Sequence, residues 1–229
     1  MTFTLISRNF LVKVFIVLLP WKLKRFFLSK LFGYNIHQTA NIGLAWIYPR
    51  HLVMHAGSTI GSFSVAVNLD LVKLDVCASI GRSNWITGFP TGTNSLHFLH
   101  QTDRHAELHL GDHSAISKCH HIDCTNVVSI GSYSTIAGYR TQILTHSIDI
   151  LSNRQHSEPI TIGDFSFVGT NCVLLGGSAL PSCSILGALS LLNKLHSDEY
   201  TLYAGQPASN IKKLDKNSGY FSRPVGFVY

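Results

Sequence analysis

The sequence predicts an all-β protein built as a solenoid of short stacked strands, and two observations carry that prediction. The first is an apolar residue at every sixth position over long stretches, with a small residue four positions after it. The second is the composition: 45% of the 229 residues are hydrophobic and only 13% are charged, so the chain has ample apolar surface for a packed core. A chain of this length suits one main domain.

The six-residue period is clearest in the C-terminal half of the chain. Every sixth residue from Ile162 is aliphatic, and a serine or cysteine follows each of the first five by four positions. An α-helix with 3.6 residues per turn would scatter these residues around its surface, whereas short strands joined by corners can point them all inward. Stacked coils of such strands bury one continuous apolar column. The aliphatic series is Ile162, Val168, Leu174, Leu180, Leu186 and Leu192, and the small residues are Ser166, Cys172, Ser178, Ser184 and Ser190.

The same period recurs earlier, together with Ile-Gly or Leu-Gly dipeptides. Glycine after the aliphatic residue predicts a corner at which the backbone needs conformational freedom. The earlier aliphatic positions are Leu110, Ile116, Ile122, Val128, Ile130 and Ile136, with a weaker series at Ile42, Tyr48, Met54, Ile60, Ala66, Val72, Leu74, Ile80 and Ile86. The dipeptides end at Gly43, Gly61, Gly81, Gly111, Gly131 and Gly163.

Two segments break the period, at residues 87–107 and 144–159. Both are rich in polar and turn-forming residues, and we expect them to be loops. Insertions in a solenoid go to one face, which is often the binding face. His146, in the sequence ILTHSIDI, therefore lies where a regular coil ends and the second insertion begins.

The chain carries a formal net charge of +6, which suits an anionic partner. No helix-turn-helix, zinc-finger or RNP pattern accompanies the charge, so nucleic acid is not expected as a partner. The basic residues gather at the two ends of the chain, at Lys13, Lys22, Lys24, Arg25 and Lys30 and at Lys194, Lys212, Lys213, Lys216 and Arg223.

The five cysteines are odd in number and include no CxxC pair. Reduced, buried thiols in a cytosolic protein are the expected interpretation, and no zinc site is indicated. They are Cys77, Cys119, Cys124, Cys172 and Cys183.

Residues 10–21 are apolar but too short to cross a bilayer, because a spanning helix needs about 20 residues. The basic and aromatic stretch KLKRFFLSKLFG follows directly. Two interpretations of residues 1–30 stay open: an amphipathic helix lying on an anionic membrane surface, or a helix packed on the protein or on a neighbouring subunit.

Four segments occur in the order found in the hexapeptide-repeat acyltransferases, and the chain resembles that family most closely from about 130 to 214. The segments are IGSYSTIAGYRTQILTHSIDI, PITIGDFSFVGTNCVLLGGSAL, ILGALSLLNKL and YAGQPASNIKKL. They resemble the catalytic-histidine coil, the coil after the loop, the last coils and the C-terminal signature of sugar and xenobiotic O-acetyltransferases. The chain departs from the family's pattern at Phe167, Leu189 and Asn193.

The resemblance implies a left-handed parallel β-helix, an exception to the right-handed rule for parallel crossovers. We expect an amphipathic helical segment at 1–35, the β-helix at 36–197, and a short C-terminal helix and tail at 198–229. The resemblance also implies a homotrimer whose active sites lie between subunits.

His146 in THSID matches the family's catalytic histidine. An alcohol must lose its proton as it attacks a thioester, and histidine can accept that proton near neutral pH while its other ring nitrogen is held in place. Either Asp149 or a backbone carbonyl is expected to orient the ring.

The cluster CHHIDC supplies the next candidates. His120 and His121 point to opposite faces of a strand, and His120 falls in a small-residue slot, which favours a structural role. His121 and Asp123 share a face, and with Arg140 they are expected to bind the acceptor; a polar outer face of the coil is the alternative. The spacing does not match a zinc site.

Acetyl-CoA is the expected acyl donor. Backbone N–H groups near Gly169 and Thr170 are expected to stabilise the oxyanion of the tetrahedral intermediate. The resemblance implies that Thr170 contacts the thioester side and Ala188 the pantetheine arm, and that Lys194, Ser209 and Lys212 approach the phosphates or the adenine end.

The function expected from these residues is acetyl transfer from acetyl-CoA to a sugar hydroxyl in cell-surface polysaccharide or glycan biosynthesis. The expected location is the cytoplasm, at the inner face of the membrane. An N-acyltransferase acting on an amino sugar and a non-catalytic β-helix scaffold are the alternatives.

Overall fold

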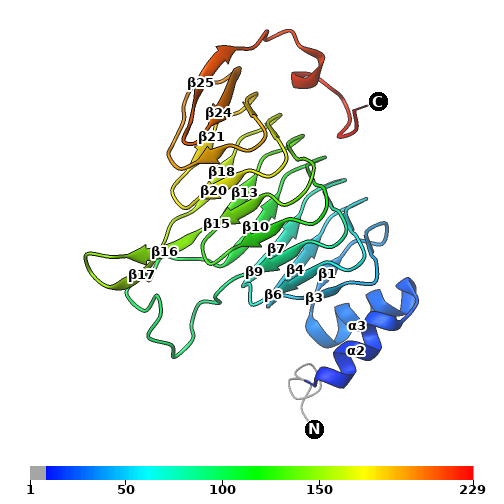
Figure 1. The fold of residues 1–229 in the computed structure, drawn as a ribbon. Coiled ribbons are helices and arrows are strands. Elements are labelled where there is room, and N and C mark those ends of the chain that lie inside the picture. Colours follow the sequence, from blue (N-terminus) through cyan, green and yellow to red (C-terminus); the bar gives the residue numbers. More distant parts are fainter. Residues whose placement is uncertain (1–8, 229) are drawn as a thin grey trace.

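A computed structural model describes residues 9–228, and these residues form a three-sided prism of stacked coils (Figure 1). Each side of the prism is a sheet of parallel strands, apart from one antiparallel strand at the C-terminal end of the second sheet. We name the three sheets A, B and C in the order in which the chain passes through them. Residue 161 pairs with residue 179, so one uninterrupted coil advances the chain by eighteen residues, three sides of six. The solenoid of short stacked strands predicted by the period is confirmed.

The strands are short, and each belongs to one side of the prism. Sheet A holds β1 (Asn35–Ile36), β4 (His51–Met54), β7 (Leu71–Leu74), β10 (Glu107–Leu110), β13 (Val128–Ile130), β18 (Ile160–Ile162) and β21 (Ala179–Leu180). Sheet B holds β2 (Asn41–Ile42), β5 (Thr59–Ile60), β8 (Ser79–Ile80), β11 (Ala115–Ile116), β14 (Thr135–Ile136), β19 (Phe167–Val168), β22 (Ile185–Leu186), β24 (Thr201–Gly205) and β25 (Ala208–Lys213). Sheet C holds β3 (Trp46–Tyr48), β6 (Val65–Val67), β9 (Trp85–Thr87), β12 (His121–Asp123), β15 (Gln142–Leu144), β20 (Val173–Leu175) and β23 (Leu191–Leu192).

The core is the inside of the prism, and the periodic aliphatic residues fill it. Every member of the series from Ile162 to Leu192 is buried, and so are the earlier series. Removing one such side chain from water contributes about 1.5–3 kcal/mol to the stability of the fold. The small residues four positions later are also buried, and several of their hydroxyls donate to carbonyls of a neighbouring coil, as Ser134 does to Gly163 at 2.6 Å and Ser166 to Pro181 at 2.8 Å. They are small because they sit inside a corner, and polar because they hydrogen-bond there.

The glycines of the repeat have a different cause from the one predicted. None of them has a positive φ; that conformation falls two residues later, on residues such as Phe63, Ser83 and Phe165. The glycines are required because consecutive coils approach closely: a Cβ on Gly81 would lie 1.9 Å from the carbonyl oxygen of Ser117. The expectation of backbone freedom at Gly81 and its equivalents was therefore wrong, and the constraint is steric.

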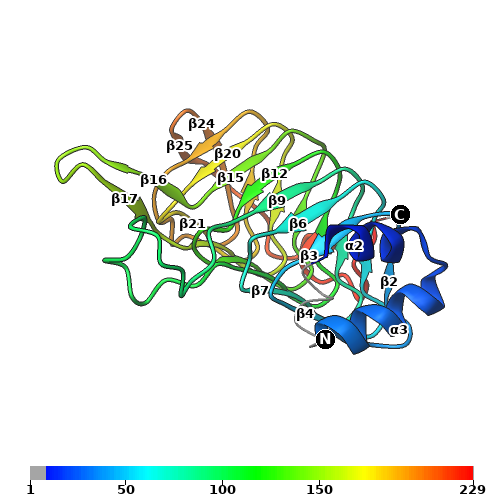
Figure 2. The same ribbon diagram turned by 90° about the horizontal axis from the view of Figure 1, so that it is seen from below.

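Two helices cover the first coil, as the sequence predicts for the N-terminal segment. Helix α2 (Phe10–Leu18) is capped by Asn9, whose side chain accepts from the N–H of Leu11. Helix α3 (Trp21–Phe32) is followed by the C-cap residue Gly33, which has a φ of 70°. The two helices lie at the N-terminal end of the prism (Figure 2). Apolar side chains on their inner faces pack against the core. No helix within residues 9–228 is long and apolar enough to cross a membrane.

The C-terminal segment differs from the expected helix and tail. Its first part continues the prism, because β24 pairs with β22 and then turns back as β25. The helix that follows is a three-residue 3-10 helix at Gly219–Phe221. Residues 201–205 alternate buried and less buried side chains, which is the period of a strand and not of a helix.

The two interruptions of the repeat lie side by side (Figure 2). The first is irregular between β9 and β10. The second is not a loop but an antiparallel arm, formed by β16 (His146–Asp149) and β17 (Arg154–Ser157). The side chain of Gln101 in the first insertion donates to the carbonyl of Ser157 in the arm at 2.9 Å, which joins the two.

All five cysteines are free thiols. Cys124, Cys172 and Cys183 are buried, as expected for residues inside a coil. Cys77 and Cys119 are exposed, so the expectation of burial was wrong for these two. Cys77, Cys119 and Cys183 all have a positive φ at a corner, so this backbone conformation does not by itself decide whether the side chain is buried.

Candidate active site

His146 lies at the corner where the chain leaves sheet C. Strand β15 ends at Leu144, Thr145 is buried at the corner, and His146 is the first residue of the projecting arm. The imidazole is 44% exposed, so a substrate can reach it. The half-exposed histidine is thus held in a fixed position, because the residues that precede it belong to the hydrogen-bonded ladder of sheet C.

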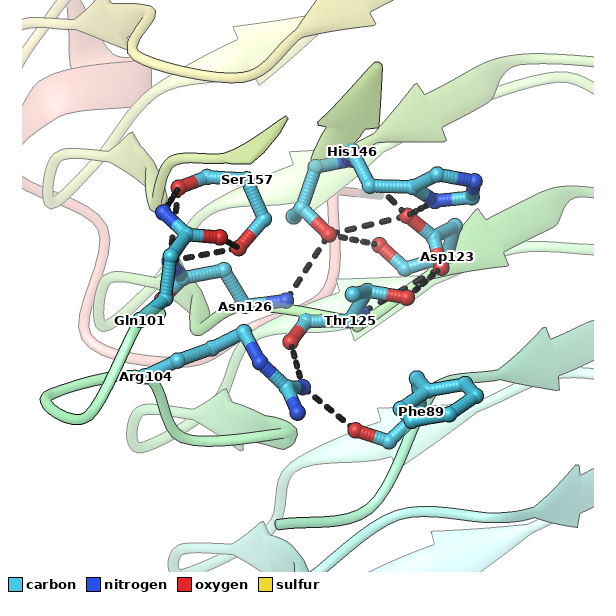
Figure 3. A network of polar contacts seen from close by, with 9 residues as sticks. Phe89, Gln101, Arg104, Asp123, Thr125, Asn126, His146 and Ser157 are labelled. Atoms are coloured by element: carbon cyan, nitrogen blue, oxygen red, sulfur yellow. Dashed lines mark hydrogen bonds and ion pairs between the residues drawn. The ribbon is translucent and has the colours of Figure 1, made fainter. Parts of the chain in front are cut away.

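The partner of His146 is Asp123, on the neighbouring strand β12. Its Oδ2 lies 2.7 Å from Nδ1 of His146 (Figure 3). The expectation that Asp149 or a backbone carbonyl orients the ring was wrong. Asp149 is exposed at the end of β16, and its carboxylate accepts instead from the hydroxyl of Ser152 at 2.6 Å and from the N–H of Leu151 at 3.0 Å.

The carboxylate of Asp123 is surrounded by donors. It accepts from the hydroxyl of Thr125 at 2.7 Å, from the hydroxyl of Thr145 at 2.9 Å, and from the N–H groups of Thr125, Thr145 and His146. Burial raises the pKa of Asp123, but the hydrogen bonds from His146, Thr125 and Thr145 outweigh that effect and the pKa is lowered. Asp123 therefore stays ionised and faces the histidine. From the sequence we expected its carboxylate to face an acceptor, and in the structure it does not.

This partner determines the protonation of His146. The hydrogen bond to Asp123 raises the pKa of the imidazole and outweighs the lowering by burial. An ionised carboxylate only accepts, so Nδ1 carries the hydrogen in the neutral ring, and the lone pair is on Nε2. The buried carboxylate of Asp123 thus selects the tautomer in which Nε2 of His146 can accept a proton.

The first insertion supports the same network. The guanidinium of Arg104 is buried and donates to the carbonyl of Thr125 at 2.6 Å and to the carbonyl of Phe89 (Figure 3). Phe98 is buried and meets the ring of His146 edge-on, with 6.1 Å between centroids. Residues 87–107 thus hold the turn that carries Thr125 and pack against the histidine.

His120 and His121 point in opposite directions, as predicted. His120 is buried, and burial lowers its pKa to about 4, so it is neutral; its Nε2 lies 2.9 Å from the hydroxyl of Ser117. His121 is exposed on the outer face of sheet C, in register with Gln142. A hollow of about 530 Å³ opens on this face, and its walls include His121, Arg140, Trp85 and Gln142.

The residues expected to contact coenzyme A fall into two groups. Thr170 and Ala188 stack one coil apart at the corner where the chain passes from sheet B to sheet C, and Ser209 on β25 pairs with Ala204 beside that corner. Lys194 lies at the opposite edge of sheet C, after β23, and Lys212 pairs with Leu202 at the far end of β25.

One of the expected oxyanion donors is already engaged. The N–H of Gly169 donates to the carbonyl of Leu186 at 2.8 Å in the ladder of sheet B, so this N–H is not free to bind an oxyanion. The side chain of Thr170 donates to the carbonyl of Tyr139 at 3.0 Å.

Within one chain, His146 and the Thr170 corner do not meet. They lie at opposite edges of sheet C, because β15 and β20 span that side of the prism between the two corners. A strand advances about 3.3 Å per residue, so the width of the side keeps them on the order of 15 Å apart.

The supporting residues Thr125, Thr145 and Arg104 were missed by the sequence analysis. A signal for Asp123 was present: aligning the coils on the buried Ile122 and Ile143 puts Asp123 opposite Leu144, two residues before His146. No signal pointed to Arg104, which reaches Thr125 through an irregular loop. Among residues 9–228, no group of three or more His, Cys, Asp or Glu side chains is arranged to hold a metal ion.

Comparison with solved structures bears on the fold. The polysialic acid O-acetyltransferase OatWY matches with a TM-score of 0.50 at 16% identity, over 83% of this chain and 92% of that protein. The chain has the left-handed β-helix fold of this acetyltransferase. A hexapeptide-repeat-containing acetyltransferase from Vibrio cholerae O1 biovar eltor, complexed with acetyl coenzyme A, matches with a TM-score of 0.46 at 20% identity, over 89% of this chain and 84% of that one.

A variant of AntD, an N-acyltransferase from Bacillus cereus in complex with dTDP-4-amino-4,6-dideoxyglucose and coenzyme A, has a TM-score of 0.48 at 14% identity, over 85% of this chain and 89% of that one. No protein-family model and no curated protein matches the chain.

Proposed function

We propose that the protein is an acyltransferase that moves an acetyl group from acetyl-CoA to a sugar hydroxyl in the synthesis of a cell-surface polysaccharide or glycan. One observation carries the proposal: a half-exposed histidine on a rigid corner, with Nδ1 bonded to a buried carboxylate. The fold is shared with an enzyme that O-acetylates polysialic acid, which favours a carbohydrate hydroxyl as acceptor. The proposed setting is the cytoplasm, at the inner face of the membrane.

In the proposed reaction, Nε2 of His146 accepts the proton of the acceptor hydroxyl as its oxygen attacks the thioester carbonyl. The tetrahedral intermediate then collapses, the carbon–sulfur bond breaks, and the imidazolium returns the proton to the departing thiolate. Asp123 stabilises the imidazolium that forms between these steps, because an ionised carboxylate lies 2.7 Å from Nδ1. No proton is left over and no other reactant is required.

The proposed acceptor site is the hollow on the outer face of sheet C, with His121 and Arg140 in its wall. An exposed indole such as that of Trp85 offers an apolar face to a sugar ring, and Arg140 offers donors to hydroxyl or carboxylate oxygens. The proposed coenzyme A contacts are Thr170 and Ala188 along the corner, with Ser209, Lys212 and Lys194 toward the phosphates and adenine.

We further propose a homotrimer in which the base of one subunit meets the coenzyme A corner of the next. The proposal is supported by the separation of His146 from Thr170 and Ala188 within one chain. Three copies related by a threefold axis close into a ring, so each sheet C edge finds one partner corner.

The reaction is tested by thiol release from acetyl-CoA with a panel of nucleotide sugars and oligosaccharides, followed by mass analysis of the products. We expect release that depends on an acceptor bearing a hydroxyl and a product heavier by one acetyl group. Matched amino sugars in the same panel separate O-transfer from N-transfer. Absence of release with every acceptor, together with absence of coenzyme A binding, would contradict the proposal and favour a scaffold.

The trimeric site is tested by mixing two inactive variants. We expect His146→Ala and Ala188→Trp to be inactive alone, because one lacks the base and the other fills the coenzyme A corner. In co-expressed mixtures, about a quarter of the interfaces combine an intact His146 with an intact Ala188, so activity should return to about a quarter of the wild-type value. Mixtures no more active than either variant would mean that each chain contains a complete site.

A further inference from the structure

The outer faces of α2 and α3 expose apolar side chains that the fold does not use. Leu11, Phe15 and Leu18 are 73%, 60% and 69% exposed, and their four- and three-residue spacing aligns them on one face of α2. On α3, Leu23 and Phe26 are also exposed. An element that only caps a solenoid presents a polar outer face to water. This surface, which we call the cap face, therefore needs a partner.

The inner faces of both helices explain why they are held firmly. Ile16 and Leu28 are buried against the first coil. The hydroxyl of Tyr48 donates to the carbonyl of Lys13 at 2.8 Å, and the buried amine of Lys24 donates to the carbonyl of Gly43 at 2.8 Å. The cap face is thus a preformed surface on an anchored helix pair.

The charge around the cap face has one sign. No Asp or Glu precedes Asp70, whereas residues 9–69 contain six Lys and Arg. Lys22 and Lys30 are exposed and lie four residues either side of Phe26, so all three share a face of α3. A second copy that met this face with its own cap face would bring cations against cations, which is unfavourable. A partner for the cap face must cover its apolar side chains and carry negative charge opposite its lysines. An anionic surface with an apolar interior does both.

We propose that the cap face docks on an anionic lipid surface. The apolar side chains of α2 and α3 enter the boundary between headgroups and acyl chains, and Lys22 and Lys30 pair with lipid phosphates. The helices have 9 and 12 residues, so the contact is interfacial. They lie at the opposite end of the prism from β24 and β25, and the arm projects from a different corner, so docking leaves His146 accessible (Figure 1). This inference is independent of the proposed acetyl transfer.

The test is co-sedimentation of the full chain with two kinds of vesicle, one of phosphatidylcholine alone and one of equal parts phosphatidylcholine and phosphatidylglycerol. We expect binding to the anionic vesicles that weakens as salt is raised. A Leu11→Ser, Phe15→Ser, Leu18→Ser triple variant should lower the partition coefficient at least about tenfold, and a Lys22→Glu, Lys30→Glu double variant by a similar factor.

Two controls carry the same kinds of chemical change elsewhere on the chain. Ile150→Ser with Leu151→Ser removes apolar side chains that are 87% and 100% exposed at the tip of the arm, and Lys118→Glu with Lys216→Glu repeats the charge change away from the cap face. Both should bind vesicles like the wild type. The proposal is overturned by equal binding to both kinds of vesicle, by loss of binding in the controls, or by absence of binding. Self-association in sedimentation velocity that the triple serine variant abolishes would assign the cap face to a second copy.

Discussion

Replacing His146 with alanine is expected to lower kcat for acetyl transfer by about 10²–10⁴-fold while the protein stays folded. The loss follows because the acceptor hydroxyl then has no base to take its proton as it attacks. Stability should change little, since the imidazole is 44% exposed and begins the projecting arm. The measurement is acceptor-dependent thiol release, with coenzyme A binding measured in parallel.

The matched control is His156→Ala on the other strand of the same arm. His156 pairs with Ser147 across the hairpin and lies 3.4 Å from Glu158, outside the network of Asp123. We expect it to retain wild-type turnover. A folded His146→Ala protein with full activity would remove His146 from the mechanism, and equal losses in both variants would point to damage to the arm.

Replacing Asp123 with asparagine is expected to lower kcat by about 10²–10⁴-fold, although the side chain keeps its size. The amide nitrogen can donate to Nδ1 of His146, which would move the ring hydrogen to Nε2 and remove the lone pair that accepts the proton. The amide nitrogen would also lie close to hydroxyl donors of Thr125 and Thr145, which now donate to the carboxylate, and it could not accept from them. Circular dichroism and thermal melting separate this effect from unfolding.

The pH profile distinguishes an orienting role from a merely structural one. The base works in its neutral form, so activity is lost as the pH falls through the pKa of His146. Asp123 raises that pKa above its ordinary value of 6.5, so the acidic limb of the wild-type profile should lie above that pH. In Asp123→Asn the residual activity should show this limb at lower pH. Asp149→Asn is the control, and an unshifted limb in Asp123→Asn or a large loss in Asp149→Asn would contradict the assignment.

The sequence by itself determined the core of this protein. Inward positions such as Ile162, Val168 and Leu174 could be read directly, because a six-residue side places one aliphatic residue inside each strand and the period records it. The interruption after Ile143 marked the corner that carries His146 for the same reason. These features are local, since each depends on residues within one coil.

What only the tertiary structure decided involves contacts between coils. Asp123 is 23 residues from His146 in sequence, yet strand pairing brings them together, while Asp149, three residues away, turns into the arm. The steric need for Gly81 likewise arises from Ser117 in the next coil. Thr170 lies across sheet C from His146 because the two residues are at the two corners that bound this side of the prism.

The arm and the C-terminal hairpin show the same limit. Residues 144–159 lack the six-residue period, and only the pairing of β16 with β17 makes them an arm. The segment from Thr201 to Lys213 was assigned to a helix and tail, but the open edge of sheet B offers β24 a strand to pair with, and that edge exists only after the coils have stacked. The period thus determines which residues face inward, because side-chain direction is set locally. Which residues meet is decided by the stacking of coils, because contact between them depends on the register of distant strands.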